Sequence, residues 1–451
     1  MKTNDTICAI STPRGVGGIA VIRLSGPDAV GIANKFCSIC EKSHQAHYSV
    51  FHAADGRIID ETVVTFFKGT HSYTGEDCVE ISCHGSTYVQ QAILQQLIDG
   101  GARLAEAGEF TKRAFVSGRL DLSQAEAVAD LIDSTNSANH QLAIQQLRGS
   151  YSQKLAELRE HFLELVSLME LELDFSDEDV EFADRSQLYH LLDQAECEMK
   201  ALTESFQLGN SIKQGVPVAI VGQPNVGKST LLNALLGDDR AIVSPTAGTT
   251  RDTIEDMMTI DGVGFRFIDT AGLRNSTDAI ECAGIERSKK AAEKAQTILY
   301  VAEAANTADE IKKELNALSK DVDLSGKQRI LVLNKTDIAE VPSIGIDGWL
   351  IKPISAKNGE GLDSLKSALV KPYLIDTLGE QPILTNIRHY EALKHGLESV
   401  GAIRNGLKAG IPSDLVVIDI REALYHIGTI TGQISSEEIL GTVFSRFCIG
   451  K

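Results

Sequence analysis

The 451-residue sequence predicts a multidomain α/β protein with an N-terminal α+β domain, an all-α helical domain and a doubly wound α/β domain inserted into the helical one. Three observations predict this organisation. Short apolar runs alternate with turns over roughly the first 118 residues. Apolar positions then recur at helical spacing, first after Ser123 and again after Pro372. Between these two helical stretches, strand-like runs alternate with helical patterns, which is typical of a parallel sheet covered by helices.

The N-terminal α+β domain is expected to span residues 1–118. Its strand-like runs include Ile19–Ile22, Thr62–Phe67 and Cys78–Ile81. A helical pattern at 87–99 ends at two glycines, which commonly terminate helices. The mixture of short strands with one clear helix predicts a compact α+β unit.

The helical domain is expected to comprise residues 119–215 and 372–451. Ser123 and Glu126 predict a capping box at the start of its first helix. A long amphipathic helix follows, and its single apolar stripe predicts a partner helix. The residues of that stripe are Leu155, Leu158, Phe162, Leu165 and Met169. Further helices are expected at 186–206, 386–407 and 413–427.

A compact domain at residues 216–371 interrupts the helical region. Its strand candidates are centred on Val218, Phe265, Ile298, Ile330 and Leu350. Helical patterns separate them, so we expect a doubly wound sheet that binds its ligand at the carboxyl ends of the strands. Insertion of such a domain is tolerated because the termini of a domain often lie close together.

The stretch Gly222-Gln223-Pro224-Asn225-Val226-Gly227-Lys228-Ser229 lies between the first strand candidate of this domain and a helical pattern. This is the context of a phosphate-binding loop. Its glycines let the backbone wrap around phosphate oxygens, and the N–H groups at the helix start point at them. Lys228 adds a positive charge for the β- and γ-phosphates, and the hydroxyl of Ser229 suits Mg²⁺.

Four further motifs follow in the order that a GTPase requires. They are Gly248-Thr249-Thr250, Asp269-Thr270-Ala271-Gly272, Asn334-Lys335-Thr336-Asp337 and Ser355-Ala356-Lys357. A switch threonine can reach Mg²⁺, and Asp269 can do so through water. The carboxylate of Asp337 accepts two N–H bonds from guanine, which adenine cannot supply. The five motifs together predict a Ras-like P-loop domain that binds and hydrolyses GTP rather than ATP.

The composition excludes several other classes. A net charge of −19 argues against a broadly basic nucleic-acid surface. No apolar stretch approaches the length of a membrane span, and the start lacks the apolar core of a signal peptide. Eight scattered cysteines suit a reducing cytoplasm. Cys37-x-x-Cys40 with His44 and His47 leaves a zinc site open as an alternative to ordinary loop thiols, although the spacing is short for a zinc finger.

The whole chain also resembles the MnmE (TrmE) family of bacterial tRNA-modification GTPases. The resemblance depends on motifs outside the GTPase domain as well as inside it. They are Asp5-Thr6-Ile7 with the glycines at 15–18, Tyr73-Thr74-Gly75-Glu76-Asp77, Gly108-Glu109-Phe110-Thr111 with Arg113-Ala114-Phe115, Leu120-Asp121-Leu122 with Gln124-Ala125-Glu126-Ala127, and Phe447-Cys448-Ile449-Gly450-Lys451.

The resemblance implies a folate-binding N-terminal domain, a helical domain and an inserted Ras-like GTPase domain. It implies modification of the wobble uridine of tRNA at the 5-position with an aminomethyl or carboxymethylaminomethyl group. The implied partners are a flavoprotein of the MnmG (GidA) type, a second copy of the chain, and tRNA. Most contacts with the tRNA would come from the flavoprotein. The acidic net charge agrees with that last expectation.

The resemblance also implies several site residues. Glu281 matches the catalytic glutamate of the family; a solvated acid at a helix start stays open as the plainer interpretation. A K⁺ ion would be bound by Asn225, Ser244, Thr246 and Thr249. 5-Formyltetrahydrofolate or a related reduced folate would be bound by Arg23, Glu80, Arg119 and Lys451. For Cys448, a role in the modification chemistry and simple packing beside Phe447 both stay open.

Leu273 follows the glycine of the second switch motif, where many Ras-like enzymes have a water-orienting Gln. Hydrolysis must therefore find its polar groups elsewhere, which agrees with K⁺ and Glu281. Arg251-Asp252 and Arg274 are more simply explained as ion-pairing residues of the switch segments than as arginine fingers.

The residues expected to bind GTP are Asn225, Val226, Gly227, Lys228, Ser229, Thr230, Ser244, Thr249, Thr250, Asp269, Thr270, Ala271, Gly272, Asn334, Lys335, Asp337, Ser355, Ala356 and Lys357, and the expected Mg²⁺ ligands are Ser229 and Thr250.

Two other functions compete with tRNA modification. One is a ribosome-assembly GTPase switch, which usually carries a basic RNA-binding domain or a second GTPase domain. The other is a GTPase scaffold without chemistry of its own. The N-terminal domain and the terminal Cys-Ile-Gly-Lys argue against both.

Overall fold

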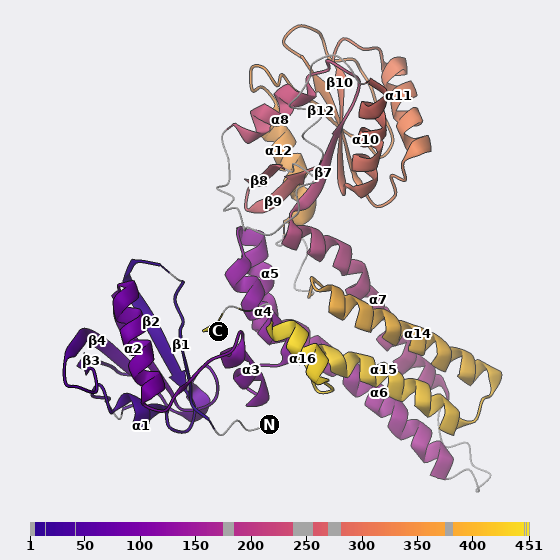
Figure 1. Cartoon of the computed structure of the whole chain (residues 1–451). Coiled ribbons are helices and arrows are strands. Elements are labelled where there is room, and N and C mark those ends of the chain that lie inside the picture. Colours follow the sequence, from indigo (N-terminus) through magenta and orange to yellow (C-terminus); the bar gives the residue numbers. More distant parts are fainter. Residues whose placement is uncertain are drawn as a thin grey trace. The chain divides into compact units, whose positions relative to one another are not determined.

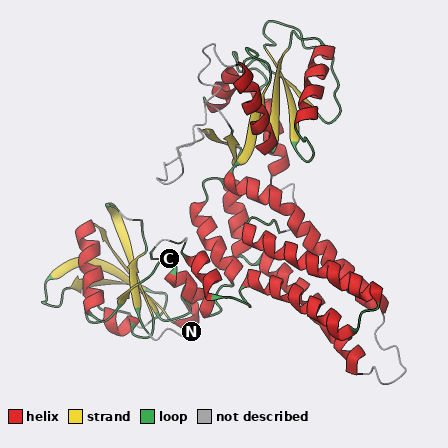
Figure 2. Cartoon of the chain, turned by 45° about the vertical axis from the view of Figure 1, so that its right-hand side comes forward, coloured by secondary structure: helices red, strands yellow, loops and turns green. Residues whose placement is uncertain are grey.

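A computed structural model describes residues 5–13, 15–40, 42–174, 185–237, 256–268, 281–374, 382–445, 447 and 449–450, with the side chains of 171–174, 185 and 281–287 left out of the description. The chain divides into two compact units. The first unit comprises Met1–Asp133, Ala143–Lys200 and Glu391–Lys451. The second unit comprises Ser134–Leu142 and Ala201–Tyr390. Both units combine helices with a sheet (Figures 1 and 2).

The N-terminal sheet of the first unit has six strands in the order β3-β4-β5-β2-β1-β6. All neighbours are antiparallel except β1 and β6. The strands are β1 (Ile7–Ile10), β2 (Gly17–Ser25), β3 (Ala46–His52), β4 (Ile58–Phe67), β5 (Cys78–Gly85) and β6 (Arg103–Leu104). Helices α1 (Ala29–Ala33) and α2 (Thr87–Asp99) pack against the sheet, and a 3₁₀ turn, η1, lies at Gly69–His71. The predicted strand runs and the predicted helix all agree with this structure.

Helices form the remainder of the first unit. They are α3 (Glu109–Val116), α4 (Leu122–Asp133), the last residues of α5 (Ser137–Leu147), α6 (Ser150–Asp174), the first part of α7 (Arg185–Gln214), most of α14 (Ile387–Ala409), α15 (Ser413–Thr431) and α16 (Glu437–Phe444). The predicted stripe of α6 is buried, and α15 is the partner helix on which it packs. Arg404 of α14 forms ion pairs with Asp193 and Glu196 of α7. Segments on both sides of the inserted domain therefore pack together, as an insertion requires.

The expected capping box at Ser123 and Glu126 is wrong. The first helix of this region begins at Leu122, so Ser123 lies inside its first turn. Asp121 is the capping residue, since its carboxylate accepts from Gln124 N at 2.8 Å. Gln124 Oε1 accepts in return from Asp121 N at 3.0 Å. The reciprocal hydrogen bonds of a capping box are therefore present two residues earlier than expected, with Asp121 and Gln124 in place of Ser123 and Glu126.

The second unit contains a doubly wound sheet in the order β12-β11-β10-β7-β9-β8. Its strands are β7 (Val216–Val221), β8 (Asp256–Ile260), β9 (Val263–Phe267), β10 (Thr297–Glu303), β11 (Gln328–Asn334) and β12 (Leu350–Pro353). All are parallel except β8, which is antiparallel to β9. The five predicted strands agree with β7, β9, β10, β11 and β12, whereas the sequence reasoning missed the edge strand β8.

Helices cover both faces of this sheet. The helices are α8 (Lys228–Leu236), α10 (Glu281–Lys294), α11 (Ala308–Asp321) and α12 (Leu362–Val370), with a 3₁₀ turn η2 at Lys371–Tyr373. Alternate residues of β7 point to opposite faces. Val218 shares a core with α8 and α12, and Ala219 shares the other core with α10 and α11. This two-sided burial explains why the parallel strands are nearly continuous apolar runs.

Candidate functional site

The phosphate loop lies between the carboxyl end of β7 and the start of α8. Its two glycines are required by the backbone. Gly222 has φ +146°, and a Cβ there would lie 2.2 Å from Val301 O on β10. Gly227 has φ +96°, and a Cβ there would lie 2.3 Å from Asn334 Nδ2. Both positions therefore exclude any larger residue, and the loop approaches its neighbours as a phosphate cradle must.

Lys228 extends across this loop. Its Nζ donates to Gly222 O at 2.9 Å and to Gln223 O at 2.6 Å. Burial lowers the pKa of the Lys228 ammonium, because the charged form is poorly solvated there. Phosphate oxygens bound at the loop would provide a negative counter-charge for this ammonium.

Asn334 connects the guanine motif to the phosphate loop. The residue ends β11 and is only 3% exposed. Its Nδ2 donates to Val226 O at 2.9 Å, and its Oδ1 accepts from Ala356 N at 3.0 Å. One side chain thus fixes the phosphate loop and two guanine-motif segments relative to one another.

Asp337 and Ser355 form the second contact of the guanine motif. Ser355 Oγ donates to Asp337 Oδ1 at 2.7 Å, which orients the carboxylate. Lys335 has φ +67°, and its ammonium pairs with Glu303 at the end of β10. A left-handed backbone at a residue other than glycine is sparsely populated and commonly marks functional loops. These motifs therefore converge at the carboxyl ends of β7, β10, β11 and β12.

Several predicted residues lie outside the described part of the chain. They are Ser244, Thr246, Thr249, Thr250, Arg251, Asp252, Asp269, Thr270, Ala271, Gly272, Leu273, Arg274, Cys448 and Lys451. Glu281 is the first residue of α10, and its side chain is likewise outside. Asn225 lies in the phosphate loop with φ +61°. The other predicted GTP-binding residues, including Ser229, Thr230 and Lys357, lie in the described motifs.

The N-terminal sheet presents a second group of predicted residues. Arg23 on β2 and Glu80 on β5 are paired in register and form an ion pair at 2.8 Å. The Arg23 guanidinium also lies 5.0 Å from the ring centroid of Tyr73 and 5.7 Å from that of Phe110. Stacked and paired in this way, Arg23 is held in one orientation.

A cavity of about 420 Å³ adjoins this ion pair. Its lining residues are His44, Phe67, His71, Ser72, Tyr73, Cys78, Glu80, Arg119, Leu120, Val128 and Leu147. The structure thus brings Glu80 and Arg119 to one cavity, hereafter the N-terminal cavity. Sequence reasoning missed His44, His71 and Leu147 as lining residues, because no local pattern marks them.

The C-terminal tail contacts the N-terminal sheet within the first unit. Ser11 Oγ donates to Gly450 O at 3.1 Å, and Ile449 pairs with Ala107 in an antiparallel bridge. A Cβ at Gly450 would lie 2.2 Å from Ile10 O, so this approach requires glycine. The described tail therefore ends beside β1.

The proposed zinc alternative at Cys37 and Cys40 gains no support. Cys37 Sγ donates to Ala33 O at 3.4 Å, and burial raises the pKa of its thiol to about 12. His47 Nε2 contacts Ser38 Oγ. Within the described ranges, no group of three or more His, Cys, Asp or Glu side chains is placed to bind a metal ion.

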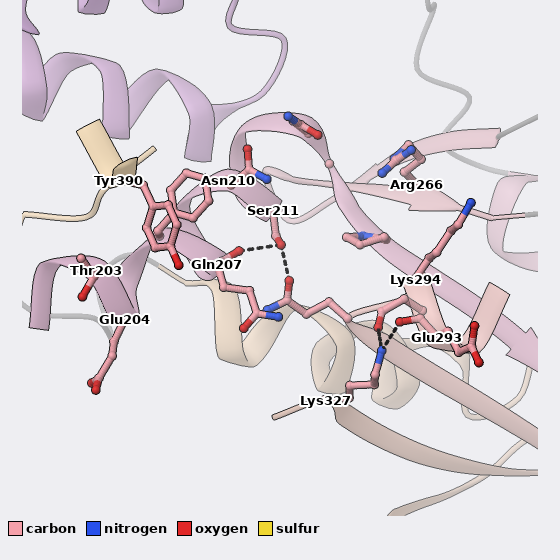
Figure 3. Close-up of a pocket in the computed structure, with 16 residues that line it drawn as sticks. Thr203, Glu204, Gln207, Asn210, Ser211, Arg266, Glu293, Lys294, Lys327 and Tyr390 are labelled. Atoms are coloured by element: carbon pink, nitrogen blue, oxygen red, sulfur yellow. Dashed lines mark hydrogen bonds between the residues drawn. The ribbon is translucent and has the colours of Figure 1, made fainter. Parts of the chain in front are cut away.

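A second described cavity, of about 750 Å³, lies at the amino ends of β7 and β11 (Figure 3). Several of its polar groups pair with one another. Ser211 of α7 donates to the side chain of Gln296, and Lys327 Nζ donates to the carbonyls of Ala292, Glu293 and Ala295 at the end of α10. These contacts make it a structural junction between α7 and α10.

Comparison with known proteins decides the family. Residues 6–119 match the family model described as the GTP-binding protein TrmE N-terminus, and residues 122–448 match that of the MnmE helical domain. A tRNA modification GTPase MnmE of Flavobacterium johnsoniae is 49% identical over 471 residues, with all of both chains covered. The chain belongs to the MnmE family. As a member of this family with a P-loop domain, it is a GTPase.

Other MnmE relatives are equally extensive. The Flavobacterium psychrophilum protein is 49% identical over all of both chains, and the Parabacteroides distasonis protein is 47% identical over 99% of this chain and 100% of its own. Both bear the name tRNA modification GTPase MnmE. Among solved structures, the G domain of the T. maritima FeoB iron transporter is 26% identical and covers 35% of this chain and 97% of its own, with a TM-score of 0.25.

Every helix in the part of the chain that the structure describes is too short or too polar to span a membrane.

Proposed function

We propose that the chain hydrolyses GTP to drive modification of the wobble uridine of tRNA at its 5-position. The observation that carries the nucleotide part is the junction at Asn334, which joins the guanine motif to the phosphate loop. The relatives' name supports the tRNA part. These full-length relatives give no support to the alternative of a ribosome-assembly switch.

Guanine selection depends on Asp337. A carboxylate held by Ser355 accepts the two N–H groups of the guanine edge. The segment Ser355-Ala356-Lys357, which Asn334 holds through its bond with Ala356 N, would lie beside the guanine oxygen and offer it a backbone N–H. Adenine lacks both features, so GTP is preferred to ATP.

The phosphate site fits Mg²⁺ and a triphosphate. A Cβ at Gly222 or Gly227 would clash with Val301 O or Asn334 Nδ2, so the glycines permit this loop conformation, and the Lys228 ammonium lies across the loop. Ser229 and Thr250 are the proposed Mg²⁺ ligands, and Mg²⁺ bound there would offset the charge of the phosphates. Within this site Lys228 stabilises the negative charge that develops on the oxygens of the transferred phosphoryl group.

Water activation requires groups other than the side chain after Gly272, because the side chain of Leu273 cannot donate or accept a hydrogen bond. We assign Glu281, at the start of α10, as the residue that positions the attacking water. Asn225, Ser244, Thr246 and Thr249 are the proposed ligands of a K⁺ ion, which would supply a positive charge beside the phosphates. The left-handed backbone of Asn225 supports a special role for this residue.

The N-terminal cavity is the proposed site for 5-formyltetrahydrofolate or a related reduced folate. Glu80 offers a carboxylate to the N–H groups of a pterin, and Arg119 offers a cation to the glutamate carboxylates. Arg23 orients Glu80 through their ion pair. Lys451 would add a second cation, and Cys448 would then lie near the same domain.

The proposed domain division is 1–118, 119–215, 216–371 and 372–451. The proposed partners are a flavoprotein of the MnmG type, tRNA and a second copy of this chain. A cytoplasmic location is proposed with them.

Nucleotide turnover tests the nucleotide part of this proposal. The full chain should hydrolyse GTP and leave ATP unchanged, while Asp337→Asn should lose the preference for guanine. Asp363→Asn, which alters an exposed carboxylate at the start of α12, is the matched control and should behave as the unaltered chain. Equal turnover of GTP and ATP by the unaltered chain would refute the assignment.

A further inference from the structure

Helix α5 belongs to both compact units. Its residues up to Leu142 are part of the second unit, and those from Ala143 onward are part of the first. The contacts of each end lie inside a single unit.

The amino end of α5 contacts the turn between β8 and β9. Asp261 and Gly262 form this turn with φ +46° and +81°, as in the tight turns of β-hairpins. Gly262 O accepts from Ala138 N at 3.0 Å and from Ser137 Oγ at 3.4 Å. A Cβ at Gly262 would lie 1.9 Å from Ser137 Oγ.

Apolar packing reinforces this contact. Ala138 and Leu142 are buried in the same core as Ile260 and Val263, the residues that flank the turn. The side chain of Asn139 donates to Lys213 O at the end of α7. The start of α5 is therefore fixed to the hairpin by hydrogen bonds and by buried surface.

The hairpin itself lies between the two segments expected to sense the nucleotide. β8 follows the segment that carries Thr249 and Thr250, and β9 leads directly into Asp269. β9 also pairs with β7, the strand that precedes the phosphate loop. The phosphate loop is therefore connected, through β7 and β9, to a hairpin whose turn is bound to α5.

The carboxyl end of α5 reaches the N-terminal cavity. Leu147 is a lining residue of that cavity, together with Glu80 and Arg119. Leu147 O accepts from Gln124 Nε2 at 3.0 Å, and Gln146 Nε2 donates to Ser123 O at 2.8 Å. Gln146 is nearly fully buried. This end of α5 is therefore held by α4, which directly follows Arg119 and Leu120.

We propose that α5 transmits the nucleotide state of the GTPase domain from the β8–β9 turn to the N-terminal cavity. Because a helix is stiff along its axis, displacement of its amino end reaches Leu147 and changes the wall of the cavity. Such coupling is reciprocal, so a ligand in the cavity changes nucleotide affinity by the same factor. This inference rests on the proposed GTP binding, and it adds a route that the function alone does not specify.

Helix α7 is the competing route, because it also belongs to both units and its Ser211 contacts Gln296 after α10. The two routes are distinguished by softening α5 alone. His140 and Gln141 are exposed in α5. Replacing both with Gly loosens the helix, whereas replacing both with Ala keeps it stiff. Both variants, H140G/Q141G and H140A/Q141A, remove the same two polar side chains. They differ in the stiffness of the helix.

The readout is hydrogen–deuterium exchange of the full chain with GDP and with a non-hydrolysable GTP analogue. We expect the amides of Gln146 and Leu147 to exchange differently in the two states, in the unaltered chain and in H140A/Q141A. H140G/Q141G should bind both nucleotides within about twofold of the unaltered chain and lose this difference. In the unaltered chain, calorimetry should show that the bound nucleotide changes the affinity for 5-formyltetrahydrofolate about fivefold or more. This effect should be lost in H140G/Q141G.

A nucleotide-dependent exchange that persists in H140G/Q141G would overturn the proposal and favour α7. Absence of the difference in the unaltered chain, with nucleotide bound, would overturn it as well. Failure of the chain to bind any guanine nucleotide would instead refute the proposed function, and this inference with it. If H140G/Q141G does not fold, Q141G compared with Q141A provides the same test with a milder change.

Discussion

Asn334 Nδ2 donates to Val226 O at 2.9 Å, so a residue of the guanine motif holds the phosphate loop from more than 100 positions away. The same side chain accepts from Ala356 N. The two halves of the nucleotide site are therefore built around one buried amide.

Asn334→Ala should weaken binding of GTP and GDP together. The substitution leaves Val226 O and Ala356 N without this buried partner, and each such loss costs roughly 1–3 kcal/mol. We expect nucleotide affinity to fall about tenfold to 100-fold, measured by titration with a fluorescent GDP analogue. Asn358→Ala, an exposed residue of the neighbouring loop, should bind normally. Unchanged affinity in Asn334→Ala would contradict the role of this junction.

Hydrolysis should require K⁺. The account depends on Asn225 as a K⁺ ligand and on the absence of a water-orienting side chain at Leu273. GTP turnover should be faster in potassium than in sodium buffer of equal ionic strength, and Asn225→Ala should remove the difference. Asn233→Ala in α8 is the control. Equal rates in both buffers, or a normal potassium response in Asn225→Ala, would count against this assignment.

The N-terminal cavity should bind 5-formyltetrahydrofolate. Calorimetry on the full chain should show binding, and Glu80→Ala and Arg23→Ala should each weaken it about tenfold or more, since charged hydrogen bonds contribute roughly 1.5–3 kcal/mol. Arg57→Ala is a suitable control, because Arg57 is exposed, pairs with Asp55 and is not a lining residue of the cavity. No binding by the unaltered chain would end the folate proposal, and normal binding after deletion of residues 448–451 would end the role of the tail.

Acid should destabilise the N-terminal domain through Glu109 and Asp5. Burial alone would raise the pKa of Glu109, but hydrogen bonds from Arg103 and Arg113 outweigh it and hold the pKa below its ordinary value of 4.5. The pKa of Asp5 is lowered in the same way, against burial, by the same two arginines. A lowered pKa in the folded state gives stability that is present above about pH 4.5 and is lost as the pH falls through the folded value.

Thermal unfolding of the full chain between pH 3 and pH 7 checks this sign. Glu109→Gln should lower the unfolding temperature near pH 7 and flatten its decline in acid, because the variant no longer takes up this proton. Asp55→Asn, at an exposed ion pair, should show neither effect. An equal decline in acid for Glu109→Gln and the unaltered chain would contradict the prediction.

Local patterns were enough to predict most elements and the places of the phosphate loop and of the guanine motif, which lie in the described part of the chain. Strands such as β7 and β11 are continuous apolar runs because both faces are buried, and their motifs follow directly in the chain. The edge strand β8 was missed because its residues, Asp256 to Ile260, mix polar and apolar types at a half-exposed edge. The helix start at Asp121 was missed because Ser123 offered a pattern of equal local quality.

Contacts between distant segments could not be predicted. Nothing near Val226 in the sequence indicates that Asn334 will bind its carbonyl. Likewise, His44 and His71 line the N-terminal cavity because the fold brings β3, β4 and η1 together. The pairing of Arg23 with Glu80 follows from the register of β2 on β5, which single residues do not encode.

The central claim is that GTP hydrolysis by this chain drives tRNA modification. Its most direct test is mass spectrometry of tRNA nucleosides from cells that lack the chain and are complemented with it or with Glu281→Ala. The account predicts that the 5-substituted wobble uridine returns with the unaltered chain and stays absent with Glu281→Ala, whose turnover should fall by about 10²-fold or more while nucleotide binding stays near normal. A full set of modified nucleosides in cells that lack the chain would contradict it.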